Sequence, residues 1–304
     1  MTDNFVPPDL PSNEYINHLK SVGKESAAIL YGSLLFKFQK WLDKNGHPLL
    51  EETNPVLVEQ YLATLKSQSA VDGSLAAIRG YFKYTSQSLP LGDPRVAIEL
   101  QRLNQISAIR PKRKPRVMKK IALGPAELKQ LLEKMQDAEV SEELYAGVVV
   151  LFYFGARAQE FAKLLNKANV DFKKREMRIQ TCKTYVERYL SWHPRLDPYM
   201  KTWHKFVKKT GGLPYPGQWL TKTLKSELGM KKVKIGDVEV TSRTCRRTFE
   251  TQMRLLGNRD IIIRAVLGHT NANIGDVYTD WTMFQPDIDK AMRENHYMID
   301  FEVI

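Results

Sequence analysis

A histidine and a tyrosine stand nine positions apart in LGHTNANIGDVYTDW, residues 267–281. They are His269 and Tyr278. Because a phenol has an ordinary pKa of about 10, Tyr278 is a poor nucleophile at neutral pH unless nearby cations favour its phenolate. The chemistry open to this pair therefore depends on which cations the rest of the chain brings to it.

Two segments each contain one cationic residue that could take part in such chemistry. Arg157, in FGARAQEF, follows an apolar stretch and precedes another predicted helix. A guanidinium buried there needs a partner, since an unpaired buried charge is costly, and a structural salt bridge to Glu160 would supply one. Lys183 lies at the tip of a predicted hairpin between EMRIQT and YVERYL. An exposed lysine is ordinary in such a turn, so neither residue alone indicates a reaction.

A third segment, TSRTCRRTFETQ at residues 241–252, contains Arg243, Arg246 and Arg247. On a helix, Arg243 and Arg246 share one face at spacing i, i+3, while Phe249 belongs to the core side. A helix face that is solvated, or that lies against a DNA backbone, explains this pattern as well as a catalytic role does.

Taken together, these residues resemble the active-site set of the tyrosine recombinases, the site-specific recombinases that include phage integrases and the Xer proteins. FGARAQEF resembles the first-arginine box of that family, in which Gly, one residue, Arg, two residues and Glu recur. TCKT is similar to its lysine-bearing hairpin, TSRTCRRTFETQMRLLG to its His-x-x-Arg-[His/Arg]-Thr-Phe helix, and LGHTNANIGDVYT to its Leu-Gly-His segment with the tyrosine nine residues on. The resemblance spans residues 13–297 and gives the set Arg157, Lys183, Arg243, Arg246, His269 and Tyr278.

The resemblance implies a role for each residue in cutting a phosphodiester bond. Tyr278 is expected to be the nucleophile, leaving a 3′-phosphotyrosyl link and a free 5′-hydroxyl. Arg157 and Arg246 are expected to bind the phosphoryl oxygens through their planar forks, supplying the positive charge that a metal ion provides elsewhere. Lys183 is the expected general acid and His269 a hydrogen-bond donor. No metal and no other cofactor are implied, and no ATP is needed because the phosphotyrosine retains the bond energy.

Arg243 is the clear departure, since the family usually has a histidine at that place. Arginine is always protonated, so Arg243 can donate hydrogen bonds but cannot act as a base. This leaves three readings: charge stabilisation only, another route for the proton of Tyr278, or a slow enzyme. A non-catalytic DNA-binding protein derived from a recombinase and a type IB topoisomerase remain the alternative functions.

Composition agrees with a DNA-binding protein. The chain has 304 residues, 43% of them apolar, and a net charge of +12, which suits a phosphate backbone. Its two cysteines, Cys182 and Cys245, are too few for a disulfide framework and are expected to be reduced, packed thiols. The six histidines form no pair at metal-ligand spacing, and no apolar run approaches the roughly 18 residues of a membrane span. We expect a cytoplasmic, nucleoid-associated protein.

Periodicity predicts a mainly α fold with a small antiparallel β-sheet. The resemblance implies that this fold is arranged as a two-domain DNA clamp. Residues 1–108 are the expected helical core-binding (SAM-like) domain, and 121–304 the catalytic domain with a C-terminal tail. Between them, 109–120 carry seven cations and two prolines and predict an extended basic linker, either a simple tether or a strap along DNA. NVDFKK, EMRIQT and TYVERYLSW predict the three strands.

Several local features of the predicted helices are specific enough to compare with a structure. In residues 27–46 the apolar spacing places six side chains inward, with Gly46 as a left-handed cap; the six are Ile29, Leu30, Leu34, Phe38, Trp41 and Leu42. Asn54 and Pro55 are placed to begin a helix, Gly124 and Pro125 another. SEELYAGVVVLFYFG, residues 141–155, is apolar enough for a buried helix, and PDIDKAMRENHY, residues 286–297, predicts the last one.

The expected partners are double-stranded DNA with a specific target site and further copies of the chain, as a tetramer on two DNA sites. In the family each protomer passes a C-terminal segment to its neighbour. The residues after Tyr278 include apolar Ile288, Met292 and Ile299, which fit that role. A tail folded on its own domain is the alternative.

The charge leads to a test by salt titration. If about six phosphates are neutralised, the affinity for duplex DNA should fall roughly 10³-fold or more between about 50 and 200 mM salt. Replacing the cations of residues 110–116 should make the slope shallower, whereas an unchanged slope would reduce the linker to a tether. A flat salt response of the whole protein would contradict DNA binding.

Overall fold

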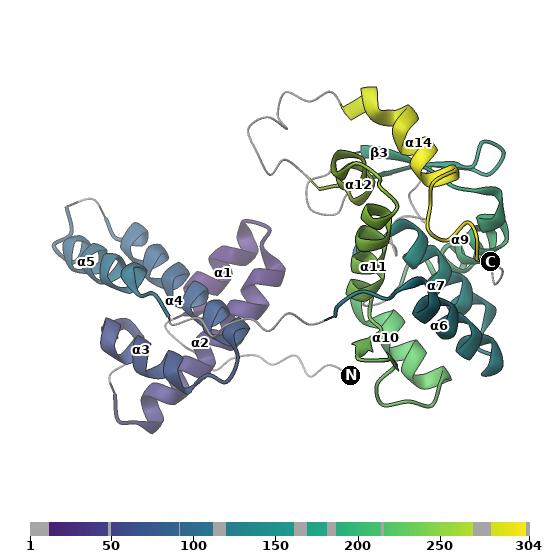
Figure 1. Ribbon diagram of the computed structural model, residues 1–304. Helices are drawn as coiled ribbons and strands as arrows, with labels where there is room; N and C mark the ends of the chain where they lie inside the picture. Colours follow the sequence, from purple (N-terminus) through teal and green to yellow (C-terminus); the bar gives the residue numbers. More distant parts are fainter. Residues whose placement is uncertain are drawn as a thin grey trace. The chain divides into compact units, whose positions relative to one another are not determined.

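The computed structural model describes residues 12–47, 50–90, 92–111, 120–160, 169–180, 187–213, 216–269 and 281–301. The chain divides into two compact units, Met1–Val117 and Met118–Ile304 (Figure 1). The described residues are mainly helical, with one three-stranded antiparallel sheet and a short hairpin. This is the fold class that the sequence predicts. None of the described helices is long and apolar enough to cross a membrane.

The first unit is a bundle of helices without a strand among its described residues. Its elements are α1 (Asn13–Ser21), α2 (Glu25–Lys44), the 3₁₀ turn η1 (Leu50–Glu52), α3 (Pro55–Thr64), α4 (Gln68–Ser88) and α5 (Arg95–Ala108). The long helix α4 packs against both α2 and α5. Asn54 begins α3 as predicted, because its side chain accepts a hydrogen bond from the Leu57 N–H at 3.0 Å and Pro55 follows at the first helical position.

The buried face of α2 differs from the prediction. Phe38 and Leu42 are buried as expected, but Ile29 is 73% exposed and Leu30 53% exposed. The buried stripe instead begins at Ala28 and Gly32. A Cβ on Gly32 would meet Ile16 of α1 at 3.7 Å, so the small residues let the two helices approach closely. The prediction gave weight to large apolar residues and missed a contact made by small ones.

The second unit contains the sheet and the remaining helices. Its elements are α6 (Pro125–Asp137), α7 (Glu142–Phe154), β1 (Asn169–Asp171), β2 (Glu176–Gln180), β3 (Glu187–Ser191), η2 (Pro194–Leu196), α9 (Asp197–Thr210), α10 (Pro216–Glu227), β4 (Lys234–Ile235), β5 (Val238–Glu239), α11 (Ser242–Leu255), α12 (Asp260–Leu267), η3 (Trp281–Phe284) and α14 (Gln285–Arg293). The β1-β2-β3 order confirms the predicted sheet. The β4–β5 hairpin was not predicted, because two-residue strands are too short to show a period.

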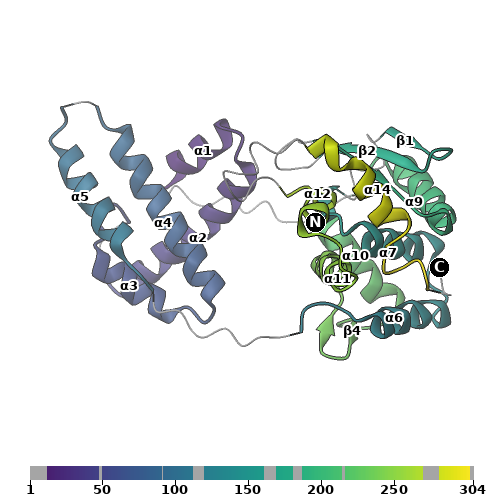
Figure 2. The same ribbon diagram turned by 45° about the horizontal axis from the view of Figure 1, so that its top comes forward.

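Helix α7 is the centre of this unit. Every residue from Ala146 to Phe154 is buried, as the continuous apolar stretch predicted. It packs against α9, α10 and α11, which surround it in Figure 2. Helix α6 begins as predicted, with Gly124 as its N-cap and Pro125 at the first helical position. The Gly124 N–H also donates to the Glu127 carboxylate at 2.7 Å, a contact that was not predicted.

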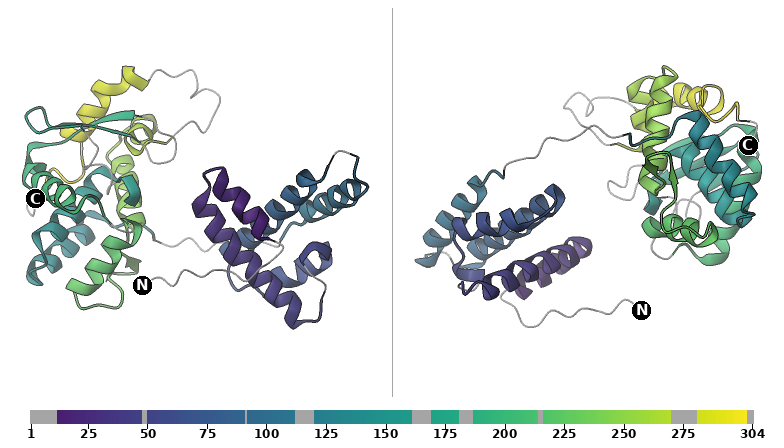
Figure 3. Two further views of the ribbon diagram at one scale, coloured as in Figure 1. Left: turned by 180° about the vertical axis from the view of Figure 1, so that it is seen from behind. Right: turned by 60° about the horizontal axis from the view of Figure 1, so that its bottom comes forward.

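The C-terminal tail packs on its own unit as far as Phe301. Helix α14 lies against β3 and α12 (Figure 3) and ends at Arg293, four residues earlier than predicted. Beyond it, the Tyr297 hydroxyl donates to the Phe152 carbonyl at 2.5 Å, and His296 Nε2 donates to the Tyr153 carbonyl at 2.8 Å. In this single chain the described tail residues are therefore folded on their own unit, and exchange of the tail with another copy stays a prediction.

Gly155 ends α7 in a left-handed conformation, with φ of 56°. A Cβ at this position would lie 2.8 Å from the Cβ of Phe249 on α11, closer than real Cβ atoms approach. The turn that leads to Arg157 therefore needs glycine for both its backbone angle and its packing.

Replacing Gly155 by alanine should lower the free energy of unfolding by about 2–4 kcal/mol, combining left-handed strain with overpacking against Phe249. Gly211 is the matched control, since it ends α9 at φ of 66° with no neighbour within 4 Å of an added Cβ. Gly211→Ala should cost only about 1–2 kcal/mol. Chemical denaturation of both variants provides the comparison, and equal losses would contradict the packing argument.

Candidate active site

Arg157 and Glu160 form an ion pair just beyond the end of α7. Arg157 Nη1 donates to Glu160 Oε1 at 2.6 Å, and the Arg157 backbone N–H donates to Oε2 at 3.2 Å. The Glu160 side chain is fully buried, whereas that of Arg157 is 29% exposed. The predicted salt bridge between Arg157 and Glu160 is thus present. Because Arg157 also reaches solvent, the pair leaves a guanidinium accessible to an anion.

A second arginine, Arg188 on β3, binds the same carboxylate and was missed in the sequence. Its Nη2 donates to Glu160 Oε2 at 3.1 Å, and its side chain is 8% exposed. The signal was present: in ERYLS the buried positions alternate, so Arg188 shares the inward face with Leu190. Burial would raise the pKa of Glu160, but the charge of Arg188 and hydrogen bonds from Arg157 hold it below its usual value. The carboxyl group is therefore ionised.

Arg246 on α11 lies at the C-terminal ends of two helices. Its Nη1 donates to the carbonyl of Gly155, which ends α7, at 3.0 Å. Its Nη2 donates to the carbonyl of Leu267, the last residue of α12, at 2.9 Å. Both carbonyls stabilise a cation. Burial and the nearby charge of Arg157 lower the pKa of Arg246 to about 10, which leaves it protonated at neutral pH.

His269 is held against Arg246. Gly268, with φ of 61°, ends α12, and the His269 N–H donates to the Arg264 carbonyl at 3.0 Å. The ring atom Nε2 lies 2.8 Å from Arg246 Nη2. Since a guanidinium only donates, Nε2 must be the acceptor, so the ring is neutral with its proton on Nδ1. Burial and the charge of Arg246 lower the pKa of His269, in agreement with the neutral form.

The remaining predicted site residues are exposed or lie outside the described part of the chain. Arg243 is exposed on α11, one turn before Arg246. Lys183 and Tyr278 lie outside the described residues, as does Cys182. Cys245 is fully buried, and burial raises the pKa of its thiol, which confirms its reading as a packed, unreactive side chain. The structure thus brings Arg157, Arg246 and His269 into one site and adds Arg188 behind them.

The described groups give this site a net positive charge. Three guanidiniums and one carboxylate leave an excess of two positive charges, because His269 is neutral. The Glu250 carboxylate also influences these groups, and it shares Arg254, 3.0 Å away, with Asp260. Such a site can bind an oxyanion and stabilise additional negative charge that develops on it during a reaction.

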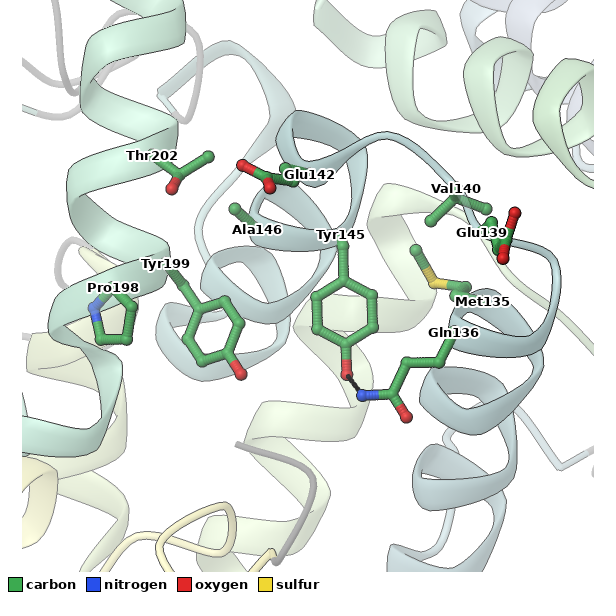
Figure 4. Close-up of a pocket in the computed structure, with 10 residues that line it drawn as sticks. All are labelled: Met135, Gln136, Glu139, Val140, Glu142, Tyr145, Ala146, Pro198, Tyr199 and Thr202. Atoms are coloured by element: carbon green, nitrogen blue, oxygen red, sulfur yellow. Dashed lines mark hydrogen bonds between the residues drawn. The ribbon is translucent and has the colours of Figure 1, made fainter.

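A separate cavity of about 420 Å³ lies between α6, α7 and α9 (Figure 4). The rings of Tyr145 and Tyr199 line it with centroids 5.9 Å apart, and Gln136 donates to the Tyr145 hydroxyl at 3.2 Å. Arg157, Arg243, Arg246 and His269, the candidate active-site residues that the structure describes, do not line it. Within the described part of the chain, no group of three or more His, Cys, Asp and Glu residues is placed to hold a metal ion.

Comparison with known proteins concerns the family and the fold of this chain. Residues 122–283 match the family model described as the phage integrase family. No curated protein matches the chain.

Several solved structures share the fold. The XerH site-specific recombinase bound to difH substrate is 16% identical with a TM-score of 0.57, covering 90% of this chain and 82% of the other. A lambda integrase tetramer bound to a Holliday junction is 17% identical with a TM-score of 0.56, covering 88% and 77%. The Tn1549 transposon integrase in complex with transposon right end DNA is 13% identical with a TM-score of 0.52, covering 90% and 95%. At these identities the likeness shows the fold.

The environment of His269 leads to a prediction for its titration. Nitrogen-detected NMR of the DNA-free protein should show a neutral ring at pH 7 with the proton on Nδ1 and a pKa below about 6.5. Arg246→Met should raise this pKa, because it removes a neighbouring positive charge.

Glu250→Gln is the opposite control. The Glu250 carboxylate raises the pKa of His269, so its loss should lower that pKa further. Shifts of the same sign in the two variants would contradict the described arrangement.

Proposed function

The chain belongs to the phage integrase family, and we propose that it is a site-specific recombinase that cuts and rejoins duplex DNA. The observation that carries the proposal is the convergence of Arg157, Arg246 and His269 on one partly exposed site. These are the residues that the family resemblance assigns to the scissile phosphate.

In the proposed reaction the Tyr278 phenolate attacks the phosphorus of one phosphodiester. The bond from phosphorus to the 5′ oxygen breaks, Lys183 protonates that oxygen, and a 3′-phosphotyrosyl link and a 5′-hydroxyl result. The pentacoordinate species carries two negative charges, one from the diester and one from the phenolate. The net positive charge of the described site suits such a doubly negative species, which supports phosphoryl transfer. Attack by another 5′-hydroxyl reverses the step without ATP.

Arg243 cannot accept the proton of Tyr278, so we assign that proton to His269. The ring is neutral in the DNA-free chain, but its Nε2 lone pair accepts from Arg246. When a phosphate oxygen takes the place of Nε2 as acceptor from Arg246, the lone pair becomes available to the phenol. A lowered pKa makes His269 a weak base, yet it keeps the ring unprotonated at neutral pH. Arg243 then contributes only positive charge and hydrogen bonds.

The proposed partner is duplex DNA with a specific site, bound by several copies of the chain. Both units are proposed to contact it, the first as the helical core-binding domain and residues 109–120 as a basic linker. A structure of similar fold, a lambda integrase tetramer bound to a Holliday junction, supports a tetramer on two sites. In the DNA-free chain the tail residues up to Phe301 pack within their own unit, so any exchange between copies accompanies assembly on DNA.

The second candidate is a DNA-binding protein without strand cleavage, which the Arg243 departure favours. It differs from the recombinase in one measurable respect, the absence of a covalent intermediate. A suicide substrate, nicked close to the cleavage point, traps such an intermediate because the short 5′-hydroxyl strand diffuses away.

With nicked duplexes made from inverted repeats beside the coding region, the wild-type protein should form a covalent complex that survives denaturing electrophoresis. Tyr278→Phe should form none, because phenylalanine has no nucleophilic oxygen, while it binds the same DNA with unchanged affinity. Tyr199→Phe, on α9, should behave as the wild type. A covalent complex with Tyr278→Phe refutes the nucleophile assignment, and footprinting without any covalent complex favours the binding-only alternative.

A further inference from the structure

Arg188 is a charged residue at a core-facing position of a strand. In the β2–β3 register it stands opposite Ile179, next to the pair formed by Met177 and Leu190. Those three apolar neighbours are each no more than 3% exposed. Arginine is rarely buried in such a setting unless it is paired. A leucine or methionine would fill this place without the cost of removing a guanidinium from water, so the charge itself needs an explanation.

The explanation lies in Glu160, which is fully buried and must remain ionised to hold Arg157. One carboxylate oxygen accepts from the Arg157 side chain, and the other accepts from both the Arg157 backbone N–H and Arg188. Among the charges around Glu160, that of Arg188 makes the largest contribution opposing the effect of burial on its pKa. With Arg188 present, Glu160 stays an anion without depending on Arg157 alone.

The charge of Arg188 also extends to the phosphate-binding groups. It is one of the positive charges that lower the pKa of Arg246. Without Arg188, the negative charge of Glu160 would cancel the positive charge of Arg157. With Arg188 included, these three side chains carry a net positive charge. The Glu160 carboxylate accepts hydrogen bonds from both the backbone and the side chain of Arg157. The orientation of this carboxylate therefore determines where the Arg157 guanidinium points.

We propose that Arg188 is a positioning residue for DNA strand cleavage, which holds Glu160 ionised and oriented so that Arg157 presents its guanidinium to the scissile phosphate. This inference rests on the proposed recombinase function. Arg188 does not itself touch the phosphate in this assignment.

The test compares the rate of covalent complex formation on a nicked suicide duplex, between pH 5.5 and 8.5, for four variants. Arg188→Met removes the charge and Arg188→Lys keeps it. The double variant Glu160→Gln with Arg188→Met removes both buried charges. Arg178→Met is the control, because Arg178 lies on the same sheet with an exposed side chain paired to Glu187. DNA affinity and thermal unfolding are measured for each.

Arg188→Met should slow covalent complex formation by about 10- to 100-fold, the effect of a misplaced catalytic group. Its DNA affinity should stay within about threefold of that of Arg178→Met, since each loses one positive charge. Its rate should also decrease as the pH falls, because Glu160 now takes up a proton and releases Arg157. Arg188→Lys should keep the wild-type pH profile and most of the rate. The double variant should fold and remain slow at every pH.

If the double variant regains the wild-type rate, the ion pair between Glu160 and Arg188 serves only the stability of the fold, and the proposal is overturned. A wild-type rate and pH profile for Arg188→Met would overturn it as well. If Arg188→Met does not fold, the double variant and Arg188→Lys still decide the question. If the wild-type protein forms no covalent complex, the proposed recombinase function is wrong, and the inference that rests on it is wrong too. If all variants cleave DNA as the wild type does, only the role proposed for Arg188 is wrong.

Discussion

Phe152, Tyr153 and Gly155 carry backbone carbonyls at the C-terminal end of α7, inside the apolar core of the second unit. The last carbonyls of a helix have no partner within the helix, and burial makes each unsatisfied one costly. Here Tyr297 binds the first, His296 the second and Arg246 the third. The end of one buried helix thus attaches the tail and α11 to the same place. The turn that follows carries Arg157, so the candidate site is built on this end.

The same constraint explains the packing of the tail. His296 is fully buried and stacks on the Tyr153 ring, with centroids 3.9 Å apart. Its Nδ1 accepts from the Met298 N–H, so Nε2 carries the proton that it donates to Tyr153. Burial lowers the pKa of His296 to about 3, which keeps the ring neutral and this arrangement intact at neutral pH. If the tail were passed to a neighbouring copy, the α7 carbonyls would need new donors.

Several cations can be held close together only if anionic or dipolar groups also contact them and stabilise their charge. The buried carboxylate of Glu160 serves Arg157, and helix-end carbonyls serve Arg246. The carbonyls leave the full charge of Arg246 in place, whereas the carboxylate of Glu160 offsets the charge of Arg157. Arg188 adds a further charge from beneath, and His269 remains neutral beside Arg246. An oxyanion that enters the site therefore meets preorganised donors whose positions depend on α7, α11 and the sheet.

The sequence by itself determined the elements whose signals are local. The continuous apolar run of α7, the alternation of the strands and the Asn54 cap each act within a few residues, so they could be recognised without a structure. The ordered motifs likewise placed Arg157, Arg246 and His269 in one set. Tertiary structure alone decided that small residues form the buried face of α2, that Arg188 shares Glu160, and which nitrogen of His269 is protonated. Those outcomes depend on contacts such as Arg188 with Glu160, 28 residues apart, or Arg246 with His269, 23 residues apart, and no local pattern encodes such contacts.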